Sequence, residues 1–257
     1  MQLPTVLIAL SLGFTATTLS APQDDAKPKN IVEQYHALSE ARDMDGLVAL
    51  WQENEYRTLS TIDQDLEGSL ALWESGLDAA KTAAMNGMQE RALFGAAAAT
   101  KAFDRPIFLD YASAFCSWND AEKAAFRGGQ AANGRAYEAK GEGKLKEARD
   151  AAEECTALAL PLGDWWGCAM GLGGSGGFKL ELGDAKGGLS DLSRARLINQ
   201  SLGLRGSELR NLKGMLACLI ELGHTPRAIT VCQELIEASE GEARTEYEAQ
   251  LKQIQGE

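Results

Sequence analysis

The chain has 257 residues, of which 45% are hydrophobic, and its 25 basic and 37 acidic side chains give a formal net charge of −12. This acidity, with no basic stretch carrying interleaved aromatic residues, argues against nucleic acid as a partner. Good helix formers dominate the composition, and no run alternates apolar and polar residues as a half-buried strand would. The sequence therefore predicts an all-α fold.

Residues 1–20 are predicted to be a secretory signal peptide. Residues 3–14 are apolar and uncharged, and small residues follow as far as Ala21, which is the order of an apolar region and a cleavage site. One feature is atypical, because no Lys or Arg precedes the apolar run. The run is shorter than the ~20 residues that a spanning helix needs, so no stable membrane span is expected in the mature chain. We expect export to the periplasm or outside the cell.

The folded part is expected to begin near Asn30, after a polar and flexible leader over 21–29 that contains two prolines. Asn30 suits a helix N-cap, with Glu33 three residues later. Asn86 and Gly87 are expected to break a long helix, and Pro106 to lie in the first turn of another. The helices expected before that proline cover residues 31–42, 45–55, 58–84 and 88–103.

A regular period of about 40 residues appears in the second half of the chain. Gly143, Gly183 and Gly223 are evenly spaced, and each is expected to end a helix in the left-handed conformation that a Cβ disfavours. Small residues follow five positions later, where they would let two antiparallel helices approach closely. These small residues are Ala148, Gly188 and Ala228, and the mostly small or apolar residues seven positions further on are Cys155, Ala195 and Leu235.

This pattern resembles the tetratricopeptide repeat over residues 130–240. The family has a glycine at the turn and small residues near it, and Ala136 and Gly176 also match its small position in the first helix, from which Leu216 departs. The period exceeds the usual ~34 residues, and the extra length lies at 162–164 and 202–204. The resemblance implies an α-solenoid, a right-handed superhelix of antiparallel helix pairs. It would comprise divergent helical repeats over 30–125, then tetratricopeptide-like repeats over 126–257 that end in a polar capping helix.

The resemblance also implies where a partner would bind. In this family the first helix of each pair lines the concave inner wall, which holds a protein or peptide without catalysis and without a cofactor. The chain is therefore expected to be a non-enzymatic scaffold. The polar residues that the repeat register places on this wall are Gln130, Asn133, Tyr137 and Lys140 in one repeat and Arg210, Lys213 and Glu221 in another.

The glycine-rich segment 171–177 allows an alternative function. Its letters match GxGxxG and GxSxG, but both patterns need a preceding strand, and the chain has only two histidines to serve a catalytic serine. Glycines inside a helix cost ~1 kcal/mol each relative to alanine. Either close helix packing offsets that cost, or the helix is broken there. A broken helix on the inner wall would suit a small-ligand carrier or an enzyme.

Three further features of the repeats leave alternatives open. Trp165 and Trp166 begin one helix, so one is expected in the core and the other half-exposed, as packing residue or binding anchor. Cys218 and Cys232 could pair on adjacent helices, unless most cysteines are small buried hydrophobic residues. His36 and His224 have no carboxylate or thiol at ligand spacing, so no metal is expected, and His224 is expected to cap the turn after Gly223.

Overall fold

The computed structural model describes residues 30–256, so the predicted signal peptide and the leader over 21–29 lie outside the described residues. The all-α prediction is confirmed, because the described residues form twelve α helices and one 3-10 helix and contain no strand. The helices are α1 Ile31–Glu40, α2 Met44–Glu53, α3 Glu55–Glu74, α4 Ala79–Phe103, α5 Ile107–Ser117, α6 Asp120–Gly141, α7 Leu145–Ala159, η1 Leu160–Leu162, α8 Trp165–Glu181, α9 Ala185–Ser201, α10 Arg205–Glu221, α11 Thr225–Glu237 and α12 Gly241–Gln255.

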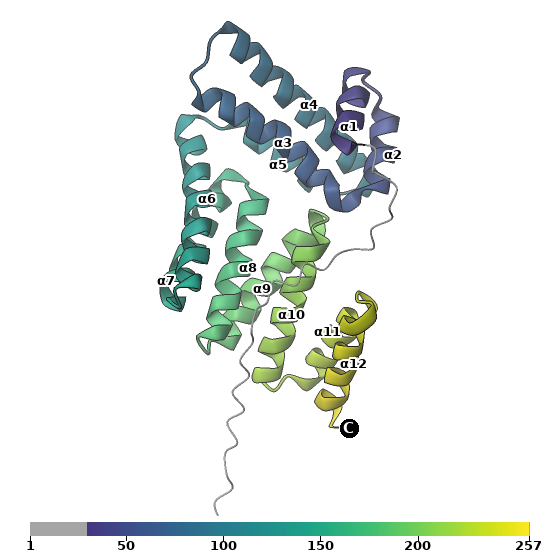
Figure 1. The fold of residues 1–257 in the computed structure, drawn as a ribbon, viewed down its shortest axis with the longest axis vertical. Helices are drawn as coiled ribbons and strands as arrows, with labels where there is room; N and C mark the ends of the chain where they lie inside the picture. The colour runs from purple at the N-terminus through teal and green to yellow at the C-terminus, as the bar shows by residue number, and fades with distance from the viewer. Residues whose placement is uncertain (1–29, 257) are drawn as a thin grey trace, which may run out of the picture.

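The helices pack in consecutive pairs (Figure 1). From α6 to α12, each helix contacts the next one along the chain, and in addition α6 contacts α8 and α8 contacts α10. The five N-terminal helices pack differently, since the long helix α4 contacts each of α1, α2, α3 and α5. The boundary predicted between residues 125 and 126 falls inside α6.

Left-handed glycines end the first helix of each pair, as predicted. Gly143, Gly183 and Gly223 have φ angles of +75°, +84° and +69°. Each of these turns reverses the chain within a few residues, so that α6, α8 and α10 are followed by the antiparallel helices α7, α9 and α11. The period seen in the sequence therefore corresponds to one helix pair with its two turns.

A second pair of turns joins the repeats to the N-terminal helices. Leu162 and Leu202 are buried in the same hydrophobic cluster as residues of α1 to α5, and the glycine after each has a positive φ. The indole Nε1 of Trp118 donates a hydrogen bond to the carbonyl oxygen of Leu162 at 3.0 Å. Arg105 reaches the carbonyl oxygen of Gln200 at 3.2 Å. The extra length of each repeat thus lies where the repeats contact the N-terminal helices.

The helix expected over 58–84 and its break at Asn86 and Gly87 are wrong. The chain turns earlier, at Gly76, where φ is +80°, and Asp78 caps α4 by accepting a hydrogen bond from the N–H of Lys81 at 2.8 Å. A capping aspartate stabilises a helix start by about 1 kcal/mol, whereas one exposed glycine inside a 25-residue helix is tolerated. Asn86 and Gly87 are both exposed within α4.

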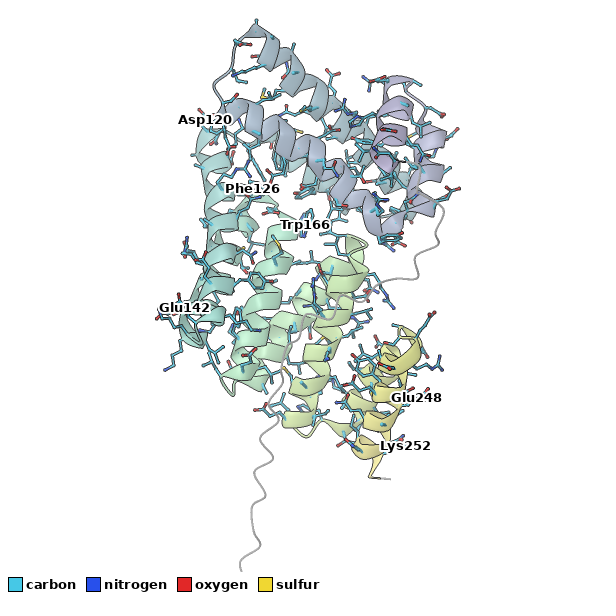
Figure 2. All side chains as sticks on the ribbon, in the orientation of Figure 1. Asp120, Phe126, Glu142, Trp166, Glu248 and Lys252 are labelled. Carbon is cyan, nitrogen blue, oxygen red and sulfur yellow. The ribbon has the colours of Figure 1, made fainter. Side chains whose placement is uncertain are left out.

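The predictions for Asn30, Pro106 and the C-terminal helix have different outcomes. Asn30 caps α1, as predicted, by accepting a hydrogen bond from the N–H of Val32. Pro106 was expected in the first turn of a helix, but it directly precedes α5. The polar helix expected near the C-terminus is α12, which has no buried residue and lies at the end of the molecule opposite the N-terminal helices (Figures 1 and 2). Among residues 30–256, no helix combines the length and apolar character that crossing a membrane requires.

Candidate functional site

The four predicted binding residues of α6 share one face of that helix, because their spacing of three, four and three residues follows the helical repeat. Gln130 and Tyr137 are exposed, and Asn133 and Lys140 are half-buried. Tyr137 is 63% exposed, which makes it one of the most exposed large hydrophobic residues in the described part of the chain. Lys140 reaches across to the next first helix, with its Nζ 3.3 Å from Glu181 on α8.

The predicted residues of α10 lie on the same layer of helices but apart from those of α6. Arg210, Lys213 and Glu221 are exposed, and a guanidinium nitrogen of Arg210 donates to the hydroxyl of Ser207 at 2.8 Å. Since α8 contacts both α6 and α10, it separates the two predicted groups. The structure therefore brings together the members of each group without joining the groups.

Helix α8 runs unbroken through the glycine-rich segment 171–177, so the predicted alternative of a helical break there is wrong. Close packing accounts for several of its glycines. A Cβ on Gly171 would lie 2.7 Å from the carbonyl oxygen of Ala152, and one on Gly176 would lie 2.7 Å from the Cγ of Leu192. Both distances are too short for real side chains, so α7 and α9 approach α8 at these glycines.

Gly177 is the exception within this segment. No atom outside its own helical backbone would lie within 4 Å of a Cβ placed there. Gly177 follows Tyr137 by one repeat period, so both occupy the same position in successive first helices. The layer formed by α6, α8 and α10 consequently has a half-exposed glycine in α8 at the position where α6 has the exposed Tyr137.

Ser175, the serine of the GxSxG letters, belongs to a partly buried ion-pair network. Its hydroxyl donates to Asp191 at 2.9 Å, and Lys179 bonds the same carboxylate at 2.6 Å. Ser175 is buried, and within residues 30–256 no hydrogen bond joins it to His36 or His224. The network links α8 to α9 and explains the serine as a structural residue.

His224 occupies the N-cap position of α11, but its side chain makes no capping hydrogen bond.

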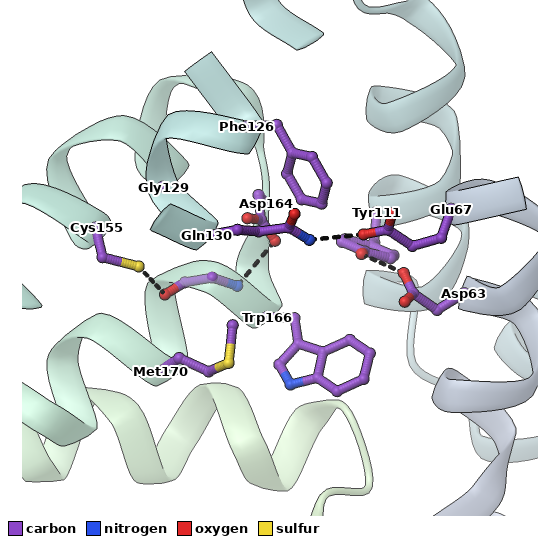
Figure 3. A pocket seen from close by; sticks show the side chains of 11 residues that line it. Asp63, Glu67, Tyr111, Phe126, Gly129, Gln130, Cys155, Asp164, Trp166 and Met170 are labelled. Atoms are coloured by element: carbon purple, nitrogen blue, oxygen red, sulfur yellow. Dashed lines mark hydrogen bonds between the residues drawn. The ribbon is translucent and has the colours of Figure 1, made fainter. Parts of the chain in front are cut away.

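A cavity of about 180 Å³ lies where α3 and α5 meet α6, α7 and α8, and the sequence did not predict it. Figure 3 shows that side chains from these helices converge on it, and Figure 2 places Phe126 and Trp166 at this junction. Both tryptophans at the start of α8 are half-buried against the N-terminal core, in place of the expected division into one buried and one half-exposed. The lining includes three carboxylates and three aromatic rings, which are Asp63, Glu67, Asp164, Tyr111, Phe126 and Trp166.

The polar groups of the cavity are partly paired with one another. The hydroxyl of Tyr111 donates to Asp63 at 2.7 Å. Glu67 accepts a hydrogen bond from Gln130 at 2.6 Å and forms an ion pair with Arg127 at 2.7 Å. Gln130, a predicted binding residue, is exposed and also lines the cavity, so the cavity reaches the surface beside the exposed face of α6.

The remaining cavity carboxylate, Asp164, caps α8. It accepts a hydrogen bond from the N–H of Gly167 at 2.8 Å. Burial raises the pKa of Asp164 to about 6 and, with the nearby charge of Glu67, outweighs the lowering by this bond. Burial also raises the pKa of Asp63 to about 7, although the hydrogen bond from Tyr111 acts in the opposite direction. Both carboxylates therefore carry charge at a cost near neutral pH.

All five cysteines are free thiols, so Cys218 and Cys232 do not pair. Four are buried and Cys116 is half-buried, which supports the alternative that they are small hydrophobic residues. Burial raises the pKa of Cys155 to about 11 and that of Cys168 to about 12. Because the thiolate is the reactive form, neither is prepared to act as a nucleophile.

A scan of the sequence against models of known protein families finds no match, and a search among curated proteins finds no significant relative. The resemblance to tetratricopeptide repeats therefore depends on the glycine positions, the small residues and the helix pairing described above.

Proposed function

We propose that this chain is a non-enzymatic scaffold, an α-solenoid of the tetratricopeptide kind that binds a protein or peptide partner. The partner would lie on the face formed by α6, α8 and α10, the first helices of the three pairs. This layer would be the concave wall of the solenoid. Export to the periplasm or the cell exterior is part of the same proposal and depends on the apolar N-terminal segment.

The packing of the helices supports this role. One helix pair cannot bury its apolar face alone, so stacked pairs generate an extended surface as a by-product of their stability. That surface has an exposed aromatic residue, Tyr137, and exposed basic residues, Arg210 and Lys213. Exposed Tyr and Arg side chains are enriched among residues that dominate binding energy at protein interfaces.

The single observation that carries the proposal is the open space at Gly177. A glycine inside a helix costs ~1 kcal/mol relative to alanine, and no neighbour within the described chain requires one at this position. A partner whose backbone or side chain lies close against α8 would require it. The glycine would then serve binding at the expense of stability.

Alanine and leucine substitutions at Gly177 test this argument. We expect Gly177→Ala to raise the free energy of unfolding by up to ~1 kcal/mol, and Gly177→Leu to fold but to retain less partner from extracts of the source cells. Gly87→Ala is the matched control, since Gly87 also has open space and lies within α4, away from the layer.

A photo-crosslinking amino acid at Tyr137 identifies which retained proteins contact the layer. The same amino acid at Glu147, on the second helix α7, reports contacts with another surface. The proposal predicts that Gly177→Leu abolishes the crosslinks made from position 137, and that the double variant Arg210→Glu, Lys213→Glu does the same. Crosslinks made from position 147 should be unchanged in both variants. Crosslinks that are unchanged in these variants, or equal from both positions, would overturn it.

A small-ligand carrier is a second candidate function, favoured by one specific observation. Its expected site at 171–177 is an ordinary helix, but the cavity between α3, α5, α6 and α8 provides a different place for a ligand.

A further inference from the structure

The cavity between the N-terminal helices and α6, α7 and α8 contains more negative charge than its surroundings balance. Glu67 has an ionic partner in Arg127. Within residues 30–256, neither Asp63 nor Asp164 has a Lys, Arg or His nitrogen within the 4.0 Å of an ion pair, although Asp164 is only 5% exposed. Buried charges in folded proteins are normally paired, because an unpaired one carries a large desolvation cost.

The other walls of the cavity are aromatic and apolar. The rings of Tyr111, Phe126 and Trp166 line it together with the thioether of Met170 (Figure 3). Aromatic faces attract cations through their quadrupole, most strongly for tryptophan. Carboxylates and aromatic rings are the two kinds of group that together bind an organic cation.

A metal ion suits this lining less well. In the described part of the chain, no group of three or more His, Cys, Asp or Glu side chains is arranged to hold one. Apolar rings cannot replace the oxygen ligands that hard cations require. The volume of about 180 Å³ is slightly larger than a cavity of ~150 Å³ that accepts benzene. A guanidinium or ammonium group on a short alkyl chain has this size.

We propose that the cavity is a binding site for an organic cation, an alkylguanidinium or alkylammonium group that lies between Asp63 and Asp164 and stacks on Trp166. The group would be carried either by a free small molecule or by an Arg or Lys side chain of a protein partner. The proposal does not require the scaffold role, because the cavity includes neither Gly177 nor the basic residues of α10 and shares only Gln130 with the predicted binding residues.

Isothermal titration calorimetry with matched probes tests the charge requirement. Butylguanidinium and butylammonium should bind saturably, and the neutral isostere butylurea should bind at least ~10-fold more weakly, a factor that corresponds to 1.4 kcal/mol. A tripeptide with central arginine, blocked at both ends, and its citrulline analogue repeat the comparison for a side chain on a polypeptide. Tighter binding of the arginine tripeptide than of butylguanidinium identifies a protein side chain as the source of the cation, and the reverse order identifies a free small molecule.

Conservative variants of Asp63 and Asp164 test whether these two carboxylates bind the cation. Asp63→Asn and Asp164→Asn should each weaken cation binding at least ~10-fold, whereas Asp110→Asn, an exposed residue next to Tyr111 on α5, should not. Asparagine also caps helices, so Asp164→Asn should keep α8 intact. Asp63→Asn should stabilise the ligand-free protein above pH 7 while it weakens binding, which a purely structural aspartate would not do.

Three results would overturn the proposal. These are no saturable binding of any cationic probe at millimolar concentration, equal binding of butylurea, and unchanged affinity in both aspartate variants. Gly177→Leu should leave cation binding unaltered, so failure here and failure of the scaffold proposal are distinguishable.

Discussion

Gly176 on α8 and Gly188 on α9 face each other where the two helices cross. A Cβ on Gly188 would lie 2.8 Å from the carbonyl oxygen of Gly176, and a Cβ on Gly176 would lie 3.0 Å from the carbonyl oxygen of Gly188. The equivalent positions of the neighbouring pairs hold Ala148 and Ala228, both fully buried. The crossings of α6 with α7 and of α10 with α11 therefore accept a methyl group, so the backbones of α8 and α9 are in closer contact than those of the other two pairs.

The first prediction concerns this crossing. We expect Gly188→Ala to lower the free energy of unfolding by about 1–3 kcal/mol, because the methyl group would force the two backbones apart. Urea denaturation monitored by circular dichroism measures the change. Gly87→Ala should have the opposite sign and gain up to ~1 kcal/mol, since nothing lies near its Cβ position. A neutral or stabilising Gly188→Ala would contradict the close crossing.

The helix pairs of the repeats could be predicted from the sequence, because each depends on local requirements that recur in every repeat. A left-handed turn at Gly143 and a close crossing at Gly188 each need glycine or another small residue, whatever the rest of the chain does. The N-terminal helices gave poorer predictions. Asn86 and Gly87 are typical turn residues, yet α4 continues through them because Asp78 provides the better helix start.

The cavity could not be predicted, since it forms where the repeat helices α6, α7 and α8 meet α3 and α5, which do not follow the repeat. Asp63 and Tyr111 are 48 residues apart and meet only because α3 and α5 pack together. The unusual pair Leu-Gly at 162–163 was a visible signal for a repeat variant. It did not reveal that the leucine enters the N-terminal core, because burial against a distant element leaves no periodic pattern.

A second prediction tests how the repeats are held to the N-terminal helices. Leu202, the C-cap of α9, is 0% exposed in the N-terminal core cluster, whereas Leu197 within α9 is 63% exposed. Leu202→Ala should lower the free energy of unfolding by about 2–5 kcal/mol through the lost contacts and the cavity left behind. Leu197→Ala should change it by less than ~0.5 kcal/mol. Equal effects in urea denaturation would show that the turn after α9 does not contribute to the junction.

A third prediction compares two aspartates that form ion pairs. Asp65 is 4% exposed, accepts a hydrogen bond from Tyr35 at 2.9 Å and pairs with Arg91 at 2.5 Å. Asp65→Ala should cost about 3–5 kcal/mol, because it leaves a partly buried guanidinium and a buried phenol without an acceptor. Asp45→Ala removes an exposed pair with Lys101 and should leave the stability nearly unchanged. Thermal unfolding of both variants, scanned at one pH, distinguishes a buried network from a surface contact.

The fourth prediction is a dependence of stability on pH that originates in the cavity. Burial raises the pKa of Asp63 to about 7, and the charges of Glu67 and Asp164 act in the same direction, against the hydrogen bond from Tyr111 and the charge of Arg127. In the unfolded chain an aspartate has a pKa of ~3.9. Between these values the folded state binds more protons than the unfolded state, so stability falls as the pH rises towards and through 7.

The Asp63→Asn variant isolates this effect, because asparagine has no charge to lose. The difference in unfolding free energy between the variant and the original chain should grow in favour of the variant by ~1.4 kcal/mol for each pH unit from pH 5 to about 7, and should then level off by pH 8. Carboxylates whose pKa is lowered, such as Glu74 beside Arg127, add stability above their ordinary pKa and lose it only in acid, so they do not contribute in this window. Urea denaturation at four pH values measures the difference. If it stays constant or shrinks with rising pH, Asp63 is paired in solution and the cavity does not hold an uncompensated charge.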